Sequence, residues 1–411
     1  MCGQSPRFEI ARSAAGIPVL CEAISPQRLA HVSLWVRGGS RHEFPGTYGA
    51  SHALEHLAVR RAAAFTWQGA VERAGGSFNA VTDREFLAFF YSAPAEFAAE
   101  CLPAFLDQLP LATRSFSAED FEVETSVLAE EWRHLGTDPA GYLLAGLHER
   151  LLPGQLRHYP GGTGEDLDLL TPGAVAEVAQ RFWARSEIAL VVSGLPAELV
   201  LDLVDRSTLS TLAERTTGTG QVVDDRERGC FEFDAPATLE ADTPILQGIG
   251  WAGPGCTDPA LAATEVAVSL LAGGSSSRLF QRVRGEHGLA YGVDGWHTAY
   301  SDAGLSTVLV QTSAEHASLV ERLVDTEIQK LIEQPVSDEE LETAQRRLVG
   351  QRFQLWEDGV ERVFAAGRTQ FIPTDTTGDL ASWARACFDV RPAEIAAAAA
   401  GFLDRHVVCH A

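Results

Sequence analysis

Hydrophobic and polar positions along the first half of the chain follow the periods of strands and amphipathic helices in turn. The pattern predicts strands at 8–10, 18–21 and 30–36, from Phe78 onward after a glycine turn, and at 188–192. It predicts helices at 51–60, 92–112, 117–134 and 197–204. Strands and helices are therefore mixed throughout this half.

The second half repeats this order after a change in composition. Residues 206–229 are rich in Ser, Thr, Gly, Asp and Arg and poor in large apolar side chains, which is typical of a linker. Beyond it the pattern predicts strands from Ile245 and at 305–311, and helices at 258–272, 314–333, 337–355 and 392–403. We therefore predict an α+β protein with domains at 1–205 and 230–411, related by an ancient duplication.

Length, composition and charge narrow the classes of function. The chain has 411 residues, 45% of them hydrophobic and 21% charged, which is ordinary for a folded protein of two or three domains. Its formal net charge is −24. Binding to nucleic acid or to an anionic membrane surface needs clustered Lys and Arg, so we expect neither partner.

The cysteines and the apolar stretches bear on the cellular location. Seven cysteines are scattered without a C-x-x-C pair, which predicts buried or inert thiols in a reducing cytoplasm. The sequence contains no stretch of about 18 uncharged apolar residues, so no transmembrane helix is predicted. The N-terminus has no basic segment followed by an apolar core, so no secretory signal is predicted.

The segment His52-Ala53-Leu54-Glu55-His56 is the strongest chemical signal in the chain. Residues four apart share one helix face, so both imidazoles can bind one metal ion. The glutamate between them can reach a water molecule at the metal without being a ligand. This is the H-x-x-E-H zinc pattern, in which three protein ligands leave the fourth position open.

A third ligand is expected on the acidic helix at 117–132. Glu122 has small side chains three, four and seven positions further along, so another helix could approach it closely. Glu124 faces Leu128 and Glu131 instead. Packing slightly favours Glu122 and leaves Glu124 as the alternative.

These motifs resemble those of the pitrilysin/insulinase family of zinc metallopeptidases, in the branch of mitochondrial processing peptidase and its bacterial relatives. The resemblance includes the H-x-x-E-H motif, the glycine turn and strand at 75–85, the glutamate-rich helix at 122–131, and the segment at 271–291. It covers roughly residues 8–405. It implies two homologous α/β-roll halves, each a mostly antiparallel sheet packed with helices.

The resemblance also implies roles for individual residues. It places Zn2+ on His52, His56 and Glu122, with Glu55 as the general base. Glu131 matches a glutamate that usually supports a ligand without binding the metal.

Further residues are implied by the same resemblance in both halves of the chain. Arg284 and Tyr291 match a pair, seven residues apart, that holds the substrate carbonyl and would stabilise an oxyanion. The strand that contains Phe78, Asn79 and Ala80 would bind an extended peptide along its edge.

The implied activity is that of a zinc metalloendopeptidase. Family members pair two such chains into a closed chamber that admits unfolded peptides, so a homodimer or a heterodimer with a related chain is expected. A role in processing or in trimming leader peptides is a hypothesis by family habit. The alternative is a catalytically silent subunit that binds peptide or supports assembly, although silent members usually lose part of the H-x-x-E-H motif, which is complete here.

Overall fold

The structure is a computed structural model that describes residues 8–22, 28–60, 66–184, 187–214, 231–234, 244–372, 380–404 and 406–410. Of the predicted linker at 206–229, residues 215–229 lie outside this described part. The chain forms two compact units. The first contains residues 1–132, 158–221 and 356–371, and the second contains 133–157, 222–355 and 372–411. In the described ranges, no helix is long and apolar enough to span a bilayer.

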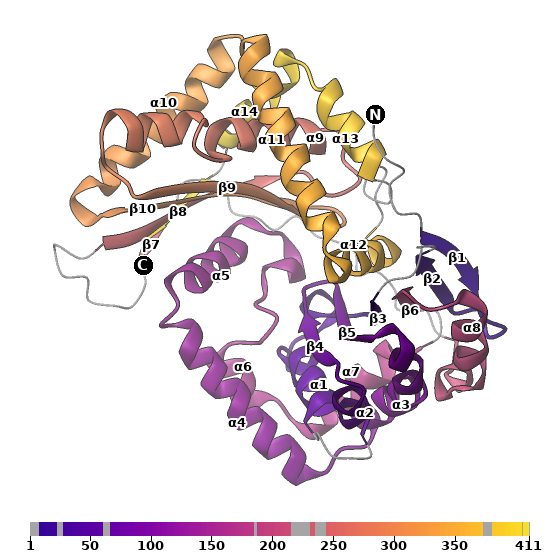
Figure 1. Ribbon diagram of the computed structural model, residues 1–411. Coiled ribbons are helices and arrows are strands. Elements are labelled where there is room, and N and C mark those ends of the chain that lie inside the picture. Colours follow the sequence, from indigo (N-terminus) through magenta and orange to yellow (C-terminus); the bar gives the residue numbers. More distant parts are fainter. Residues whose placement is uncertain are drawn as a thin grey trace. The chain divides into compact units, whose positions relative to one another are not determined.

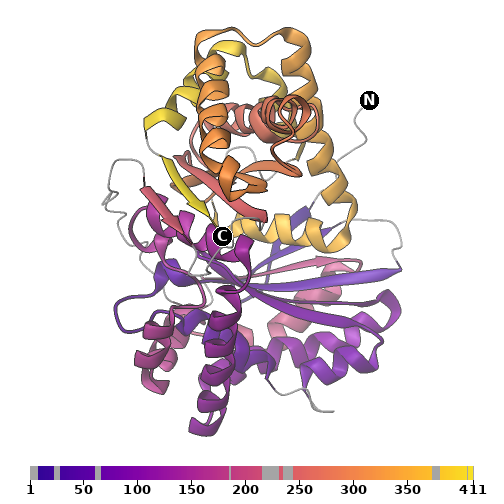
Figure 2. The ribbon, with the colours of Figure 1, turned by 90° about the vertical axis from the view of Figure 1, so that its left-hand side faces the viewer.

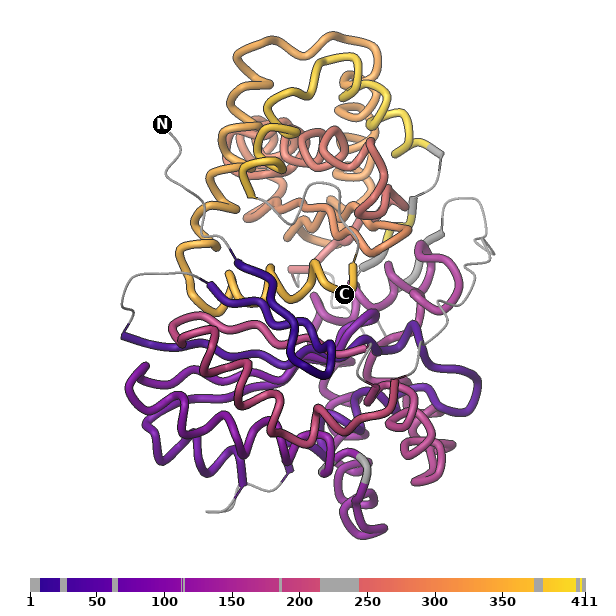
Figure 3. The backbone as a smooth tube through the Cα atoms, turned by 90° about the vertical axis from the view of Figure 1, so that its right-hand side faces the viewer, coloured from indigo at the N-terminus to yellow at the C-terminus, as the bar shows by residue number. Residues whose placement is uncertain are grey.

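The first unit is built on a six-stranded sheet with the order β1-β2-β6-β3-β5-β4. Only β2 and β6 pair in parallel among these neighbours. The strands are β1 Phe8–Arg12, β2 Pro18–Glu22, β3 Leu29–Arg37, β4 Ser77–Thr82, β5 Phe86–Pro94 and β6 Ile188–Ser193. Figure 3 shows the indigo β1–β2 hairpin at one end of this sheet. Strand β4 forms the opposite edge.

Helices cover both faces of the first sheet (Figure 1). Helices α1, α3 and α7 pack together on one face, and α12 packs against β3 and β6 on the other. The close approach of α12 to β3 requires a glycine at position 367, because a Cβ there would lie 2.0 Å from the ring of Trp35 on β3. The helices of this unit are α1 Ala50–Val59, α2 Trp67–Arg73, α3 Ala95–Arg114, α4 Ala118–Leu135, α6 Gly164–Leu169, α7 Pro172–Phe182, α8 Ala197–Arg206 and α12 Gly359–Phe371.

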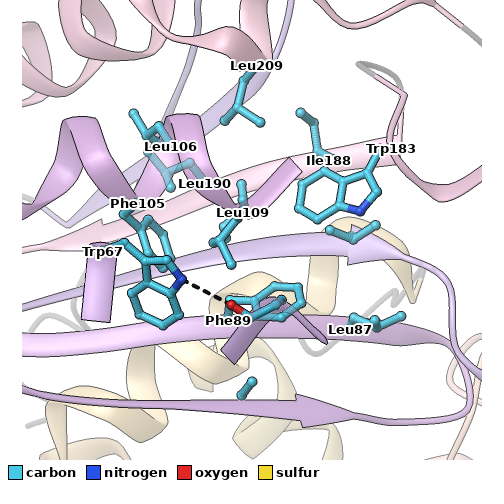
Figure 4. Close-up of a cluster of buried hydrophobic side chains, with 14 of the residues drawn as sticks. Trp67, Leu87, Phe89, Phe105, Leu106, Leu109, Trp183, Ile188, Leu190 and Leu209 are labelled. Atoms are coloured by element: carbon cyan, nitrogen blue, oxygen red, sulfur yellow. Dashed lines mark hydrogen bonds between the residues drawn. The ribbon is translucent and has the colours of Figure 1, made fainter. Parts of the chain in front are cut away.

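The core between this sheet and its helices is continuous and largely aliphatic, with a few aromatic rings among the Leu, Val and Ala side chains (Figure 4). Trp67 contacts the rings of Phe78 and Phe105 edge to face, with centroid separations of 5.1 and 5.2 Å. The same indole Nε1 donates a hydrogen bond to the carbonyl of Ala58. Helix α1 is thus fixed against β4 from within the core.

The second unit repeats the strand order with β7-β11-β8-β10-β9. Among the described strands of this sheet, β7 and β11 pair in parallel. The other neighbours, β11 with β8, β8 with β10 and β10 with β9, are antiparallel. The strands are β7 Phe231–Asp234, β8 Pro244–Gly253, β9 Gly292–Ala299, β10 Gly304–Ser313 and β11 His406–His410. Two mostly antiparallel sheets of like topology confirm the predicted α+β class with two similar halves.

Helices also pack against the sheet of the second unit (Figure 2). Helices α9 and α14 contact the sheet and α10 packs on α14, whereas α5 contacts β8 and β11. A π-helical segment, η5 Phe280–Glu286, precedes β9. The helices are α5 Pro139–Leu151, α9 Leu261–Ala272, α10 Ala317–Glu333, α11 Asp338–Glu357, α13 Leu380–Asp389 and α14 Pro392–Asp404.

The structure corrects the predicted end of the chain. The sequence pattern predicts a helix as the last element, but α14 is followed by β11, which pairs with both β7 and β8. This strand has only five residues, too short for a periodic signal, and its place is decided by the two strands that bond to it.

Candidate metal centre and active site

Helix α1 carries the H-x-x-E-H segment and begins at a left-handed glycine, Gly49, with φ +85°. The buried carboxylate of Glu43 accepts backbone N–H groups of Gly49 at 2.9 Å and of Ser51 at 2.6 Å. Glu43, which lies in the loop before α1, therefore caps the N-terminal, positive end of the helix dipole. Burial is the main cause that raises the pKa of Glu43 to about 7, although these hydrogen bonds oppose it.

One face of α1 brings His52 and His56 together, with ring centroids 4.6 Å apart. Each imidazole Nε2 faces the carboxylate of Glu131 on α4: His52 at 3.6 Å and His56 at 3.4 Å. The three side chains form a group whose candidate ligand atoms all lie within 4.8 Å of one another. Within the described residues, no other trio of metal-binding side chains meets this criterion.

The geometry of this trio fits a zinc ion. Ligand atoms about 2.1 Å from a tetrahedral zinc lie about 3.4 Å from each other, close to the separations from Glu131. Burial and, to a smaller extent, the neighbouring His56 lower the pKa of His52 to about 3. His52 is thus neutral at pH 7, as a histidine ligand must be. The Glu131 side chain stays 47% exposed, which leaves an open side.

The structure brings Glu131 to the two histidines, whereas Glu122, the predicted third ligand, lies away from them. Glu122 is exposed on the opposite face of α4, outside the cluster. The small residues beside it do not mark a helix contact, because the Thr125 and Ser126 hydroxyls donate to carbonyls of their own helix.

Glu124, the alternative ligand, supports the cluster instead. Its carboxylate lies 3.2 Å from His56 Nδ1, the nitrogen that faces away from Glu131. The guanidinium of Arg60 lies 3.4 Å from the same carboxylate and balances its charge. A carboxylate on the outer nitrogen of a histidine ligand fixes the ring and its tautomer. The sequence signal was the seven-residue spacing of Glu124 and Glu131, which puts both on one helix face.

Glu55 lies beside the cluster without joining it. Its Oε2 accepts a hydrogen bond from Thr82 Oγ1, on β4, at 2.5 Å. Burial is the main cause that raises the Glu55 pKa, which makes a carboxylate a better base near neutral pH. The sequence did not single out Thr82.

The predicted peptide-binding residues Phe78, Asn79 and Ala80 lie on β4, which is an edge strand. Asn79 is exposed, and its Oδ1 accepts the backbone N–H of Ala80 at 2.9 Å. The Ala80 N–H therefore does not serve the ladder with β5. The outer edge of β4 offers backbone groups to an extended chain.

Arg284 and Tyr291 lie together in the second unit. The Arg284 guanidinium carbon is 5.4 Å from the centre of the Tyr291 ring and 5.0 Å from that of Phe280. Tyr291 is 76% exposed. Arg284 comes from the π-helical segment, a feature frequent at functional sites. The guanidinium of Arg284 and the hydroxyl of Tyr291 are thus accessible to a ligand that binds at the surface of the second unit.

Comparison with known sequences decides the family. The profile described as "Insulinase (Peptidase family M16)" matches residues 18–156, and that described as "Peptidase M16 inactive domain" matches residues 170–348. The chain belongs to peptidase family M16. The H-x-x-E-H segment and Glu131 both fall in the first match.

Relatives in this family cover most of the chain. The "Uncharacterized zinc protease YmxG" of Bacillus subtilis is 23% identical over 87% of this chain and 86% of its own length. An "Uncharacterized zinc protease" of Streptomyces coelicolor is 27% identical over 82% of this chain and 74% of its own.

Solved structures share the fold. A protease from Helicobacter pylori superposes with a TM-score of 0.85 at 16% identity, covering 99% of both chains. A structure described as a peptidase M16 inactive domain from Pseudomonas fluorescens gives 0.80 at 17% identity, covering 98% of this chain and 97% of that one. At these identities the likeness concerns the fold alone.

Proposed function

We propose that this member of peptidase family M16 is a zinc-dependent endopeptidase that hydrolyses unfolded or extended peptides. The observation that carries the proposal is the His52, His56 and Glu131 trio beside a separate, half-buried Glu55. The names of the relatives as zinc proteases support the same metal and reaction. When bound, Zn2+ supplies Lewis acidity and activates a water molecule for attack on a peptide carbonyl.

The residues of the chain take distinct roles in this proposal. Glu55 accepts a proton from the attacking water and passes it to the leaving amine. Arg284 and Tyr291 donate to the oxygen on which negative charge develops. The edge of β4 at Phe78, Asn79 and Ala80 holds the peptide by main-chain hydrogen bonds.

Assembly, processing role and location belong to the same proposal. The reaction takes place in a chamber formed with a second copy or a related chain, in the cytoplasm. Acidic residues outnumber basic ones by 56 to 32, which favours basic peptides near the protein. Trimming of leader peptides is one processing role that fits such a substrate class.

The experiment compares the wild-type chain with Glu55→Gln on a mixture of unstructured peptides, with products read by mass spectrometry. Glu55→Gln removes the base but no ligand, so it should keep one zinc per chain and lose at least about 100-fold in rate. A chelator-treated sample serves as the metal control.

Each outcome separates one alternative. Cleavage that both controls abolish supports a self-sufficient metallopeptidase. Zinc at one per chain without cleavage, alone or with any related chain, favours the silent peptide-binding subunit. Loss of zinc in Glu55→Gln would show that the roles are assigned wrongly.

A further inference from the structure

Thr82 holds the carboxylate of Glu55 through its side chain. Its hydroxyl donates a hydrogen bond to Glu55 Oε2. Helix α1 packs directly on β4, so this contact joins neighbouring elements.

Thr82 is itself held in place by its surroundings. It is the last residue of β4 and pairs with Leu87 of β5. The turn that follows is closed by the Asp83 N–H, which donates to the Phe86 carbonyl at 2.9 Å. A second segment supports this turn, because the Arg41 N–H donates to the carbonyl of Arg84 at 2.9 Å. A side chain on such an anchored strand can fix another side chain more tightly than one on a free loop.

We propose that Thr82 is a positioning residue that orients Glu55 for proton transfer. A glutamate on a helix has rotatable bonds that place its carboxylate in several directions, and only some of them reach the reacting water. A hydrogen bond from an anchored residue selects one of these directions. This inference rests on the proposed function, because it assumes that Glu55 is the base.

The position of Thr82 also joins the base to the substrate strand. Asn79 and Ala80, on the proposed peptide-binding edge, belong to the same strand as Thr82. A peptide that pairs with this edge is therefore aligned by the backbone that aligns Glu55. Thr82 should accordingly affect the rate of the chemical step and leave the binding of peptide almost unchanged.

The test uses Thr82→Val, which keeps the shape but removes the hydroxyl, and Thr82→Ser, which keeps the hydroxyl. Thr82→Val should lower kcat by about 10- to 100-fold, with KM within about twofold. Thr82→Ser should restore kcat to within about threefold of the wild type. Zinc content should stay at one per chain in both. Thr326→Val is the matched control, since it removes a hydrogen-bonding hydroxyl from α10 in the other unit.

Two further measurements distinguish positioning from a structural role. In the Glu55→Gln background, Thr82→Val should cause no further loss of rate, because the residue acts only through Glu55. A crystal structure of Thr82→Val should show the Glu55 carboxylate displaced while the trio stays in place. Thr82→Ala replaces Thr82→Val in every arm if the valine variant does not fold.

The contrary results are equally definite. An unchanged kcat in Thr82→Val with an active wild type overturns the inference alone, as does a serine variant as slow as the valine variant. Equal losses from Thr82→Val with and without Glu55 also overturn it. A wild type that is inactive, or no faster than Glu55→Gln, overturns the proposed function and with it the inference.

Discussion

Helix α4 presents acidic side chains on two faces, and only one of them reaches the histidines of α1. Phe121 and Leu128 are buried in the core and set the rotation of the helix. Glu124 and Glu131 share their side and meet the imidazoles, whereas Glu122 is exposed. The two positions between Glu122 and Glu124 turn the side chain by about 200°, which is enough to exchange a solvated carboxylate for one that contacts His56.

The difference between these carboxylates predicts the effect of substitution on zinc affinity. Glu131→Gln should weaken binding by more than about 100-fold, because it removes the anionic ligand. Glu124→Gln should weaken it by about 10- to 100-fold, the usual loss for a group that supports a histidine ligand. Glu122→Gln is the matched control on the same helix and should bind as the wild type does.

Competition with a zinc-chelating dye measures the three affinities. Equal affinities of Glu131→Gln and Glu122→Gln would contradict the assignment of the third ligand. A Glu122→Gln variant weaker than Glu131→Gln would restore the role that the sequence motif implied.

At the scale of elements, the β4–β5 hairpin is held by the loop before α1. Gly39 has φ +83°, and a Cβ there would lie 2.0 Å from the carbonyl oxygen of Asp83. Gly16, in the turn between β1 and β2, has a similar φ of +86°, but a Cβ added there would meet nothing within 4 Å. The two glycines share a positive φ and differ in the space that surrounds them.

This contrast predicts two different costs in the free energy of unfolding. Gly16→Ala should cost about 1–2 kcal/mol, the strain of a left-handed alanine. Gly39→Ala should cost at least about 2 kcal/mol more, because the turn at Asp83 must move away. Gly39→Ala should also lower peptidase activity, since Thr82 precedes that turn.

Urea unfolding of both variants beside the wild type, followed by tryptophan fluorescence, measures these costs. Equal shifts of the unfolding midpoint would show that the turn yields without cost. The prediction would then be wrong for Gly39.

At the scale of the whole molecule, the proposed groups are divided between the two units. The metal-binding trio and Glu55 belong to the first, and Arg284 and Tyr291 to the second. Tyr291→Phe should lower kcat by about 100-fold, the usual loss for one donor to an oxyanion. It should leave zinc content unchanged, because no ligand is altered. Tyr142→Phe, in the same unit, is the control for loss of a phenol hydroxyl.

Mixing two inactive variants shows which chain supplies the donor. Glu55→Gln and Tyr291→Phe should recover activity when combined if one chain's Tyr291 serves the partner's zinc site. No recovery, with each variant still able to dimerise, would place both groups in the same chain. Unchanged kcat in Tyr291→Phe would remove this residue from the mechanism.

Local sequence was enough for the features that depend on near neighbours. The pairing of His52 with His56 follows from four-residue spacing in a helix, and the structure brings them together. Runs of apolar residues predicted β3 and β6, whose positions are mostly or wholly buried. The order of elements also predicted two similar halves, because each half repeats it within its own segment.

Tertiary structure decided what depends on contacts between distant segments. Glu131 rather than Glu122 faces the histidines because the core contacts of α4 fix its rotation. Thr82 reaches Glu55 because α1 packs on β4, and β11 is a strand because β7 and β8 bond to it. Periodicity in a sequence states which residues share a face, but only packing determines what that face meets.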